Sequence, residues 1–190
     1  MMHDFIVKNR SYRRFDDSKE ISADILRQLV DLARLSGSGM NVQPLKYILS
    51  AEKKKNEMIF PALAWAAYLK DWDGPKEGER PSAYIIMLGD TTIRKNFGYD
   101  PGIAAQSILL GAAESGLGGC MIASVKRELL QSKLRVPDWY EILLVLALGY
   151  PAEKVVLDEV EHDGDTKYWR DEKDVHHVPK RKLDDIILKL

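Results

Sequence analysis

The sequence of 190 residues has a single cysteine, Cys120, and no apolar run long enough to span a bilayer. One cysteine cannot form an internal disulfide, and no Cys/His pattern with zinc spacing accompanies it. A membrane helix needs roughly 18 consecutive apolar residues, and the polar start at residues 1–4 does not match a signal peptide. We therefore expect a soluble, cytoplasmic protein without a metal site and without membrane contact.

An excess of charge of either sign is also absent. The 28 Lys and Arg residues nearly balance the 29 Asp and Glu residues, which gives a net charge of -1. Such a balance produces no overall field that would attract nucleic acid, so any anion site must be local. With 45% hydrophobic residues, the length suits one domain, 1–190.

Common enzyme motifs are missing as well. There is no Walker lysine, nucleophile elbow or HExxH pattern, and Gly116–Met121 lacks the third glycine of the dinucleotide fingerprint. The acidic segment Asp158–Asp165 lacks the terminal glutamate of an EF-hand, so we expect a solvated loop. The adjacent His176 and His177 would not share one helical face, so we expect structural or surface residues.

Patterns of apolar residues predict alternating helices and strands. Ser22 can cap a helix that ends near residues 36–37, and 61–68 also has a helical pattern. Three apolar runs predict strands in the middle of a sheet: Tyr47–Ala51, Ala83–Leu88 and Ile142–Leu148.

The clearest helix extends from Asp100 to Gly116. Asp100 is its predicted N-cap, Pro101 its first helical residue, and Gly116 follows its last turn. Its interior is apolar or small on nearly all sides, which favours burial against the sheet and a partner. An ordinary buried helix in a monomer is the alternative.

Two short segments carry the functional information. In Arg10–Phe15, arginines three residues apart with a hydroxyl between them fit phosphate or carboxylate oxygens, or negative charge developing on a ring. In Ser38–Pro44, side-chain and backbone amides of an irregular loop can bind the polar edge of a planar ligand. The alternatives are a solvated basic surface and a plain loop.

Together with Gly149–Pro151, these segments resemble the FMN-dependent nitroreductases through the patterns R-S-x-R-x-F, S-x-x-N-x-Q-P and G-Y-P. The resemblance implies an α+β fold, a three-layer α/β/α sandwich with a central mixed sheet and FMN at a homodimer interface. It implies an oxidoreductase that passes a hydride from NADH or NADPH through FMN to a nitroaromatic, quinone or similar acceptor. A flavin-binding sensor or carrier with little turnover is the alternative, and flavin destruction or reductive dehalogenation on the same fold is a third possibility.

The resemblance also implies roles for residues. Arg13 would lie at the N1 and O2 edge of the flavin, and no side chain need act as a general acid. Arg10, Ser11 and Arg181 would bind the phosphate and ribityl chain, with Lys180 or Lys182 assisting, because 176–190 resembles the closing basic segment that reaches this site after crossing the dimer. The flavin ring would contact two sets of residues: Ser38, Gly39, Asn41 and Gln43 from the other subunit, and Met121, Ile122, Ala123 and Ser124. Segment 65–81 could form a lid, with Trp65, Tyr68 and Trp72 as candidates to shape the substrate pocket.

Overall fold

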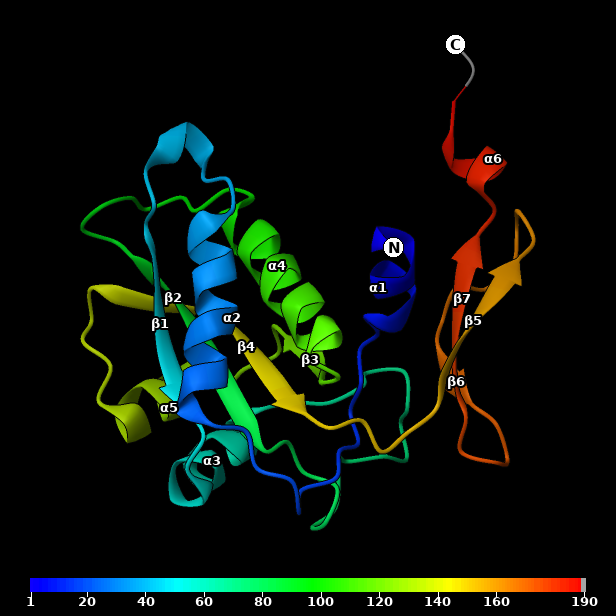
Figure 1. The fold of residues 1–190 in the computed structure, drawn as a ribbon, viewed down its shortest axis with the longest axis horizontal. Helices are drawn as coiled ribbons and strands as arrows, with labels where there is room; N and C mark the ends of the chain where they lie inside the picture. The colour runs from blue at the N-terminus through cyan, green and yellow to red at the C-terminus, as the bar shows by residue number, and fades with distance from the viewer. Residues whose placement is uncertain (189–190) are drawn as a thin grey trace.

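The computed structural model describes residues 1–188, and its largest element is a four-stranded sheet (Figure 1). The strands are β1 (Leu45–Ser50), β2 (Ala83–Asp90), β3 (Gly118–Ile122) and β4 (Tyr140–Gly149), in the order β1-β2-β4-β3. The three predicted strands are therefore present, but β1 lies at an edge of the sheet. Every neighbouring pair is antiparallel. The sequence led us to expect a mixed sheet, and a parallel pairing is present as an isolated bridge between Ser11 and Gly119 on β3.

The two faces of this sheet are covered by different helices, which confirms the predicted α+β class with three layers. Alternate residues of β2 belong to two separate clusters because successive side chains point to opposite faces. One cluster joins the sheet to α2 (Ala23–Leu35) and α4 (Asp100–Glu114). The other joins it to α3 (Lys53–Ile59) and α5 (Arg127–Leu134).

Helix α2 begins as predicted, since the Ser22 hydroxyl accepts a hydrogen bond from the Ile25 amide at 3.3 Å. Helix α4 begins differently. Its N-cap is Tyr99, and Asp100 lies in the first turn with its side chain 4% solvent-exposed. The prediction that Asp100 caps the helix was wrong because its carboxylate instead binds the loop at residues 38–39.

The predicted helix over 61–68 is also absent. A 3-10 helix, η2 (Phe60–Ala62), ends there, and Leu63 forms an antiparallel bridge with Val125. The Ala64 amide donates to the Ser124 carbonyl at 3.0 Å, and Ala66 has a φ of 35°. Pairing with the segment after β3 outweighs the local helical pattern, so tertiary contacts decide this conformation.

The C-terminal part forms a separate small sheet, visible at the right of Figure 1, where α1 (Met2–Lys8) is drawn between it and the main body. Its strands are β5 (Val155–Val160), β6 (Trp169–Arg170) and β7 (His176–Arg181), in the order β5-β7-β6, followed by α6 (Leu183–Ile186). The expected solvated loop over 158–165 was wrong in its first part, because residues 158–160 pair with β7. Within residues 1–188, no helix is long and apolar enough to cross a membrane.

Candidate functional site

The basic segment at residues 10–15 lies between the main sheet and the C-terminal sheet. Ser11 forms the bridge to Gly119, and Phe15 forms a second bridge to Pro151. Phe15 is fully buried and packs against Gly149, where a Cβ atom would lie 2.6 Å from the phenyl ring. These contacts at both ends fix Arg13, which is 9% exposed.

The guanidinium of Arg13 is held by uncharged groups. Its Nη1 donates to the Ser11 carbonyl at 3.1 Å and lies 3.2 Å from Nε2 of His176, while its Cζ lies 4.8 Å from the centre of the Tyr168 ring. Within residues 1–188 no carboxylate forms an ion pair with it. The positive charge of Arg13 is therefore buried but not neutralised.

His176 is 1% exposed and is neutral at ordinary pH. Burial lowers its pKa to about 4, and the charges of Arg13 and Arg170 add to this effect. Because the arginine can only donate, Nε2 must accept and Nδ1 must carry the proton. The buried Nδ1 has no partner among the described residues.

The neighbouring carboxylate, Glu153, is already paired with another arginine. Its side chain is 2% exposed and accepts from the guanidinium of Arg170 at 2.9 Å. It also accepts hydrogen bonds from the backbone amides of Arg13 and Arg14. Glu153 thus orients the backbone of the basic segment, and Arg170 balances its charge.

Arg13 lies where two cavities meet. One, of about 300 Å³, is lined at its basic end by Arg10, Ser11 and Lys180. The other, of about 280 Å³, has mainly apolar and aromatic residues in its lining, and both cavities are lined by Arg13, Met121 and Tyr168. The second cavity is lined by Ala64, Trp65, Ala66, Ala67, Cys120, Ile122, Ala123 and Ser124 as well. Burial raises the pKa of the Cys120 thiol, so this cysteine is no candidate nucleophile.

The structure thus brings together most of the sequence-predicted site residues. They are Arg10, Ser11, Arg13, Met121, Ile122, Ala123, Ser124 and Lys180. Of the three candidate cations in the closing segment, Lys180 lines the cavity. Arg181 donates to the His162 carbonyl at 2.7 Å, and Lys182 pairs with Glu161 at 2.8 Å. Lys180 lines the cavity of its own chain, and the crossing to the partner that the sequence led us to expect stays a prediction.

The polar loop lies elsewhere in the chain. The Ser38 hydroxyl donates to Asp100 at 2.6 Å and accepts from the Gln43 amide at 2.9 Å, while the Gly39 amide donates to Asp100 at 2.8 Å. Asn41 and Gln43 have positive φ values of 56° and 53°. Ser38 and Gln43 line a cavity of about 230 Å³ that shares no lining residue with those around Arg13.

Sequence reasoning missed Tyr168 and His176. The available signal was the alternation of side chains along a strand. On β7 it turns His176 inward, whereas His177 binds Asp158 at 2.8 Å and Asp171 at 3.5 Å. Tyr168 follows a turn and has no pattern that would identify it.

Of the three aromatic residues in the expected lid, Trp65 lines the apolar cavity. Tyr68 is 54% exposed, and its ring lies 4.9 Å from that of Tyr168. Trp72 lies under the guanidinium of Arg170, 4.4 Å from it. The segment thus contacts the residues that hold Arg13.

Comparison with known proteins agrees with this geometry. The model of the nitroreductase family matches residues 6–150. The chain belongs to the nitroreductase family, a class of flavin-dependent oxidoreductases. The matched part contains both sequence motifs but ends before Tyr168, His176 and Lys180.

Solved structures show the same fold. A candidate NADH dehydrogenase/NAD(P)H nitroreductase from Parabacteroides distasonis is 25% identical, with a TM-score of 0.66 over 80% of this chain and 88% of that chain. An FMN-dependent nitroreductase from Clostridium difficile is 22% identical, with a TM-score of 0.63 over 79% and 87%. A nitroreductase family protein from Streptococcus pneumoniae is 16% identical, with a TM-score of 0.72 over 100% of both chains.

Proposed function

We propose that this protein is an FMN-dependent oxidoreductase that transfers a hydride from NADH or NADPH to a nitroaromatic, quinone or similar electron-poor acceptor. The observation that carries the proposal is the buried, unneutralised charge of Arg13 at the junction of a cavity with basic residues and a cavity lined mainly by apolar and aromatic residues. A ligand with an anionic end and a flat, largely apolar ring system matches this arrangement. Family membership and the FMN-dependent relative support the choice of FMN.

The residues around the two cavities fit the chemistry of FMN. Arg10, Ser11 and Lys180 would bind the phosphate and ribityl chain. Burial lowers the pKa of Arg10, and its Nε is buried without a partner among the described residues, so a donor is available there. Residues 121–124 would contact the ring from the other cavity.

The role of Arg13 follows from its uncharged partners. FMN, when bound, supplies the hydride chemistry, and a cation near its N1 and O2 edge stabilises the negative charge of the reduced form. His176, Tyr168 and the Ser11 carbonyl orient the guanidinium without cancelling its charge. A carboxylate in place of one of these uncharged partners would pair with Arg13 and remove most of that stabilisation.

The polar loop would complete the site from a second subunit. Ser38, Gly39, Asn41 and Gln43 lie apart from Arg13 in one chain, while α4 connects the two places: Asp100 holds the loop, and Gln106 and Leu109 line the basic cavity. Ile103 on the same helix is 42% exposed. A homodimer that packs across α4 would bring the loop of one subunit toward Arg13 of the other.

The first test is the absorbance spectrum of the purified protein. We expect bound FMN whose absorbance bleaches with NADH or NADPH under anaerobic conditions and recovers with a quinone or nitroaromatic. Initial rates should give the parallel double-reciprocal lines of a ping-pong mechanism. Bound FMN that resists bleaching would favour the sensor or carrier, and a protein that cannot take up FMN would refute the proposal.

Complementation tests the shared site. We expect Arg13→Gln and Ser38→Ala homodimers to be weakly active, each for a different defect. A heterodimer of the two variants should recover activity because one of its two sites contains neither change. A catalytically active monomer by light scattering, or a heterodimer without recovery, would contradict the dimeric site.

A further inference from the structure

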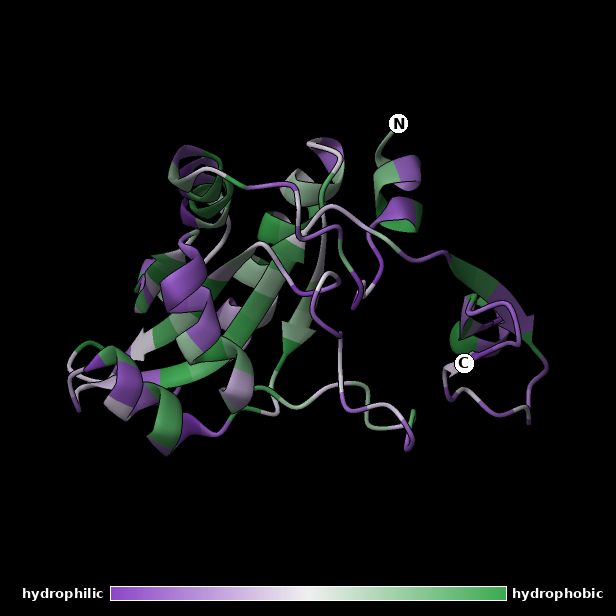
Figure 2. Ribbon diagram, turned by 90° about the horizontal axis from the view of Figure 1, so that it is seen from below, coloured by the Kyte–Doolittle hydropathy of each residue, from purple (hydrophilic) through white to green (hydrophobic). Residues whose placement is uncertain are grey.

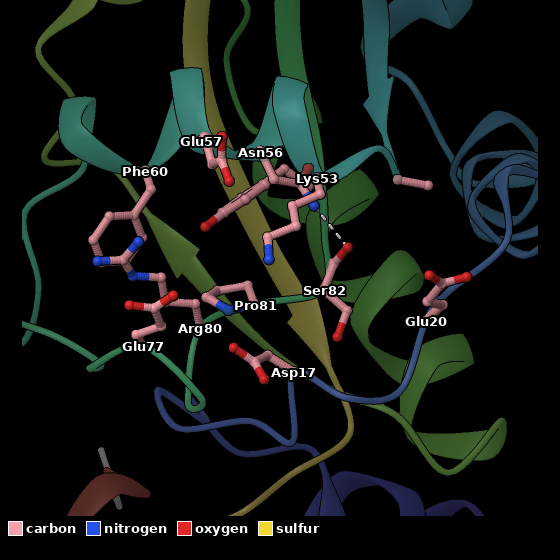
Figure 3. A pocket seen from close by; sticks show the side chains of 12 residues that line it. Asp17, Glu20, Lys53, Asn56, Glu57, Phe60, Glu77, Arg80, Pro81 and Ser82 are labelled. Carbon is pink, nitrogen blue, oxygen red and sulfur yellow. Dashed lines mark hydrogen bonds between the residues drawn. The ribbon is translucent and has the colours of Figure 1, made fainter.

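A further cavity lies beside α3 and contains polar groups that the proposed oxidoreductase site does not use (Figure 3). Its volume is about 190 Å³. That volume holds roughly six waters, so it suits a ligand far smaller than a nucleotide. None of its lining residues lines the cavities around Arg13.

The inner part of this cavity offers hydrogen-bond donors without partners. Tyr84 is 1% exposed, and its hydroxyl forms no hydrogen bond with any residue of the described chain. Ser82 Oγ and Arg80 Nε are also buried and unpaired there. A buried polar group left unpaired costs about 1–3 kcal/mol, so the two buried groups, together with the unpaired Tyr84 hydroxyl, indicate a place for an acceptor.

Two positively charged side chains also line this cavity. The guanidinium of Arg80 lies 4.4 Å from the centre of the Phe60 ring and forms no ion pair within residues 1–188. Stacking on a ring leaves the edge of a guanidinium free to bind a carboxylate. Lys53 is exposed like the rim, but in Figure 3 its amine points into the middle of the cavity, and it forms no ion pair in the described chain. Burial raises the pKa of the Tyr84 hydroxyl, which therefore remains a donor.

The rim has the opposite charge. Its carboxylates are exposed and form no ion pair within residues 1–188; they belong to Asp17, Glu20, Glu57 and Glu77. Asp17 is fixed because it accepts a hydrogen bond from the Gly78 amide at 2.8 Å. Figure 3 shows its side chain directed toward the cavity from the side opposite Lys53. A simple anion would be repelled by this rim, and a simple cation by Arg80 and Lys53.

We propose that this cavity binds a small zwitterion, with its carboxylate against Tyr84 and Arg80 and its ammonium group against Asp17. One molecule then matches one unpaired charge of each sign, that of Arg80 and that of Asp17, which neither a monoanion nor a monocation achieves. The residues of this site are separate from those proposed to bind FMN.

Three probes with the same four-carbon chain test this proposal by titration of the FMN-loaded protein followed by NMR chemical shifts. They are γ-aminobutyrate, which has both charges, butyrate and butylamine. We expect γ-aminobutyrate to bind at least tenfold more tightly than either singly charged probe, a difference of about 1.4 kcal/mol or more. Equal binding of the three, tighter binding of a singly charged probe, or no saturable shift with γ-aminobutyrate would overturn the proposal.

Two nearly isosteric variants test binding of the carboxylate and of the ammonium group separately. Tyr84→Phe should weaken γ-aminobutyrate and butyrate about tenfold and leave butylamine unchanged. Asp17→Asn keeps the acceptor for Gly78 and should weaken γ-aminobutyrate and butylamine but not butyrate. Tyr99→Phe, at a residue that is 88% exposed, is the matched control. Variants that fold, as judged by amide spectra, and bind all probes like the wild type would refute the assignment.

Discussion

The main sheet and the C-terminal sheet are held in place by different forces. Both clusters of buried apolar residues come from the main sheet and the helices around it, and neither contains a residue after Tyr150. The part of the chain after Tyr150 contacts the rest chiefly through polar and aromatic side chains, which are those of Glu153, Tyr168, Arg170 and His176. Figure 2 shows the contrast as apolar strands in the main body and mixed colouring in the C-terminal part.

This difference determines what each part contributes to the candidate site. The apolar body fixes Met121 and its neighbours at the end of β3. The polar contact places Tyr168 and His176 around Arg13. The position of the cation therefore depends on these polar contacts as well as on the packing of Phe15, and substitutions should affect the two parts differently.

The strongest test of the polar contact is Glu153→Ala. Removing one partner of a buried ion pair leaves Arg170 unpaired and typically costs about 3–5 kcal/mol. We expect the free energy of unfolding to fall by that order and FMN affinity to fall with it, both measured by denaturant titration with and without FMN. An effect as small as that of the exposed pair variant Asp31→Ala would show that the C-terminal sheet is held by something else.

The matching test of the apolar body is Leu146→Ala, at a fully buried residue of β4. A cavity in a packed core costs about 2–5 kcal/mol, whereas Leu157→Ala on β5, at a residue that is 40% exposed, should cost well under 1 kcal/mol. Urea unfolding curves give both values. Similar losses for the two variants would contradict the division into an apolar body and a polar attachment.

Lowering the pH should weaken the polar contact of the C-terminal sheet with Arg13 before it destabilises the apolar core of the main sheet. Burial lowers the pKa of His176 to about 4 from its ordinary value of 6.5. Between these values the unfolded state binds more protons, so the stability supplied by the neutral imidazole is present above about pH 6.5 and is lost as pH falls toward 4. We expect wild-type stability to fall by about 1–3 kcal/mol over this interval relative to His176→Gln. Parallel pH profiles for the two proteins would refute the role of His176.

The finest comparison is between adjacent arginines. Arg14 pairs with Glu79 at 3.6 Å and Asp174 at 3.3 Å, whereas Arg13 has uncharged partners. A charge-assisted hydrogen bond is worth about 1.5–3 kcal/mol, which corresponds to roughly 30–60 mV for a two-electron couple. Arg13→Gln should lower the midpoint potential of bound FMN by that amount, and Arg14→Gln by much less. Equal shifts in spectroelectrochemistry would remove Arg13 from its proposed role.

Much of the fold was predictable because local signals and tertiary contacts agree. Ser22 caps α2, and the apolar runs at 83–88 and 142–148 form the central strands. The failures occur where distant partners compete. Asp100 binds the loop at 38–39 instead of its own helix, and residues 63–64 pair with the segment after β3.

The candidate site was predictable only in part, for the same physical reason. The motifs at 10–15 and 121–124 carry their chemistry in adjacent residues, and they lie around the same two cavities. Tyr168 and His176 contribute single side chains from a sheet whose position depends on buried charges. No local pattern in the sequence encodes which arginine such a histidine contacts.

The contact between Phe15 and Gly149 has a consequence for how such sequences can change. A Cβ atom at residue 149 would collide with the ring, and a smaller side chain at residue 15 would leave a void beneath the basic segment. Neither residue can be replaced alone without moving Arg13. The two positions are expected to covary across homologous chains, and a library that randomises both together should recover functional pairs that single-site libraries miss.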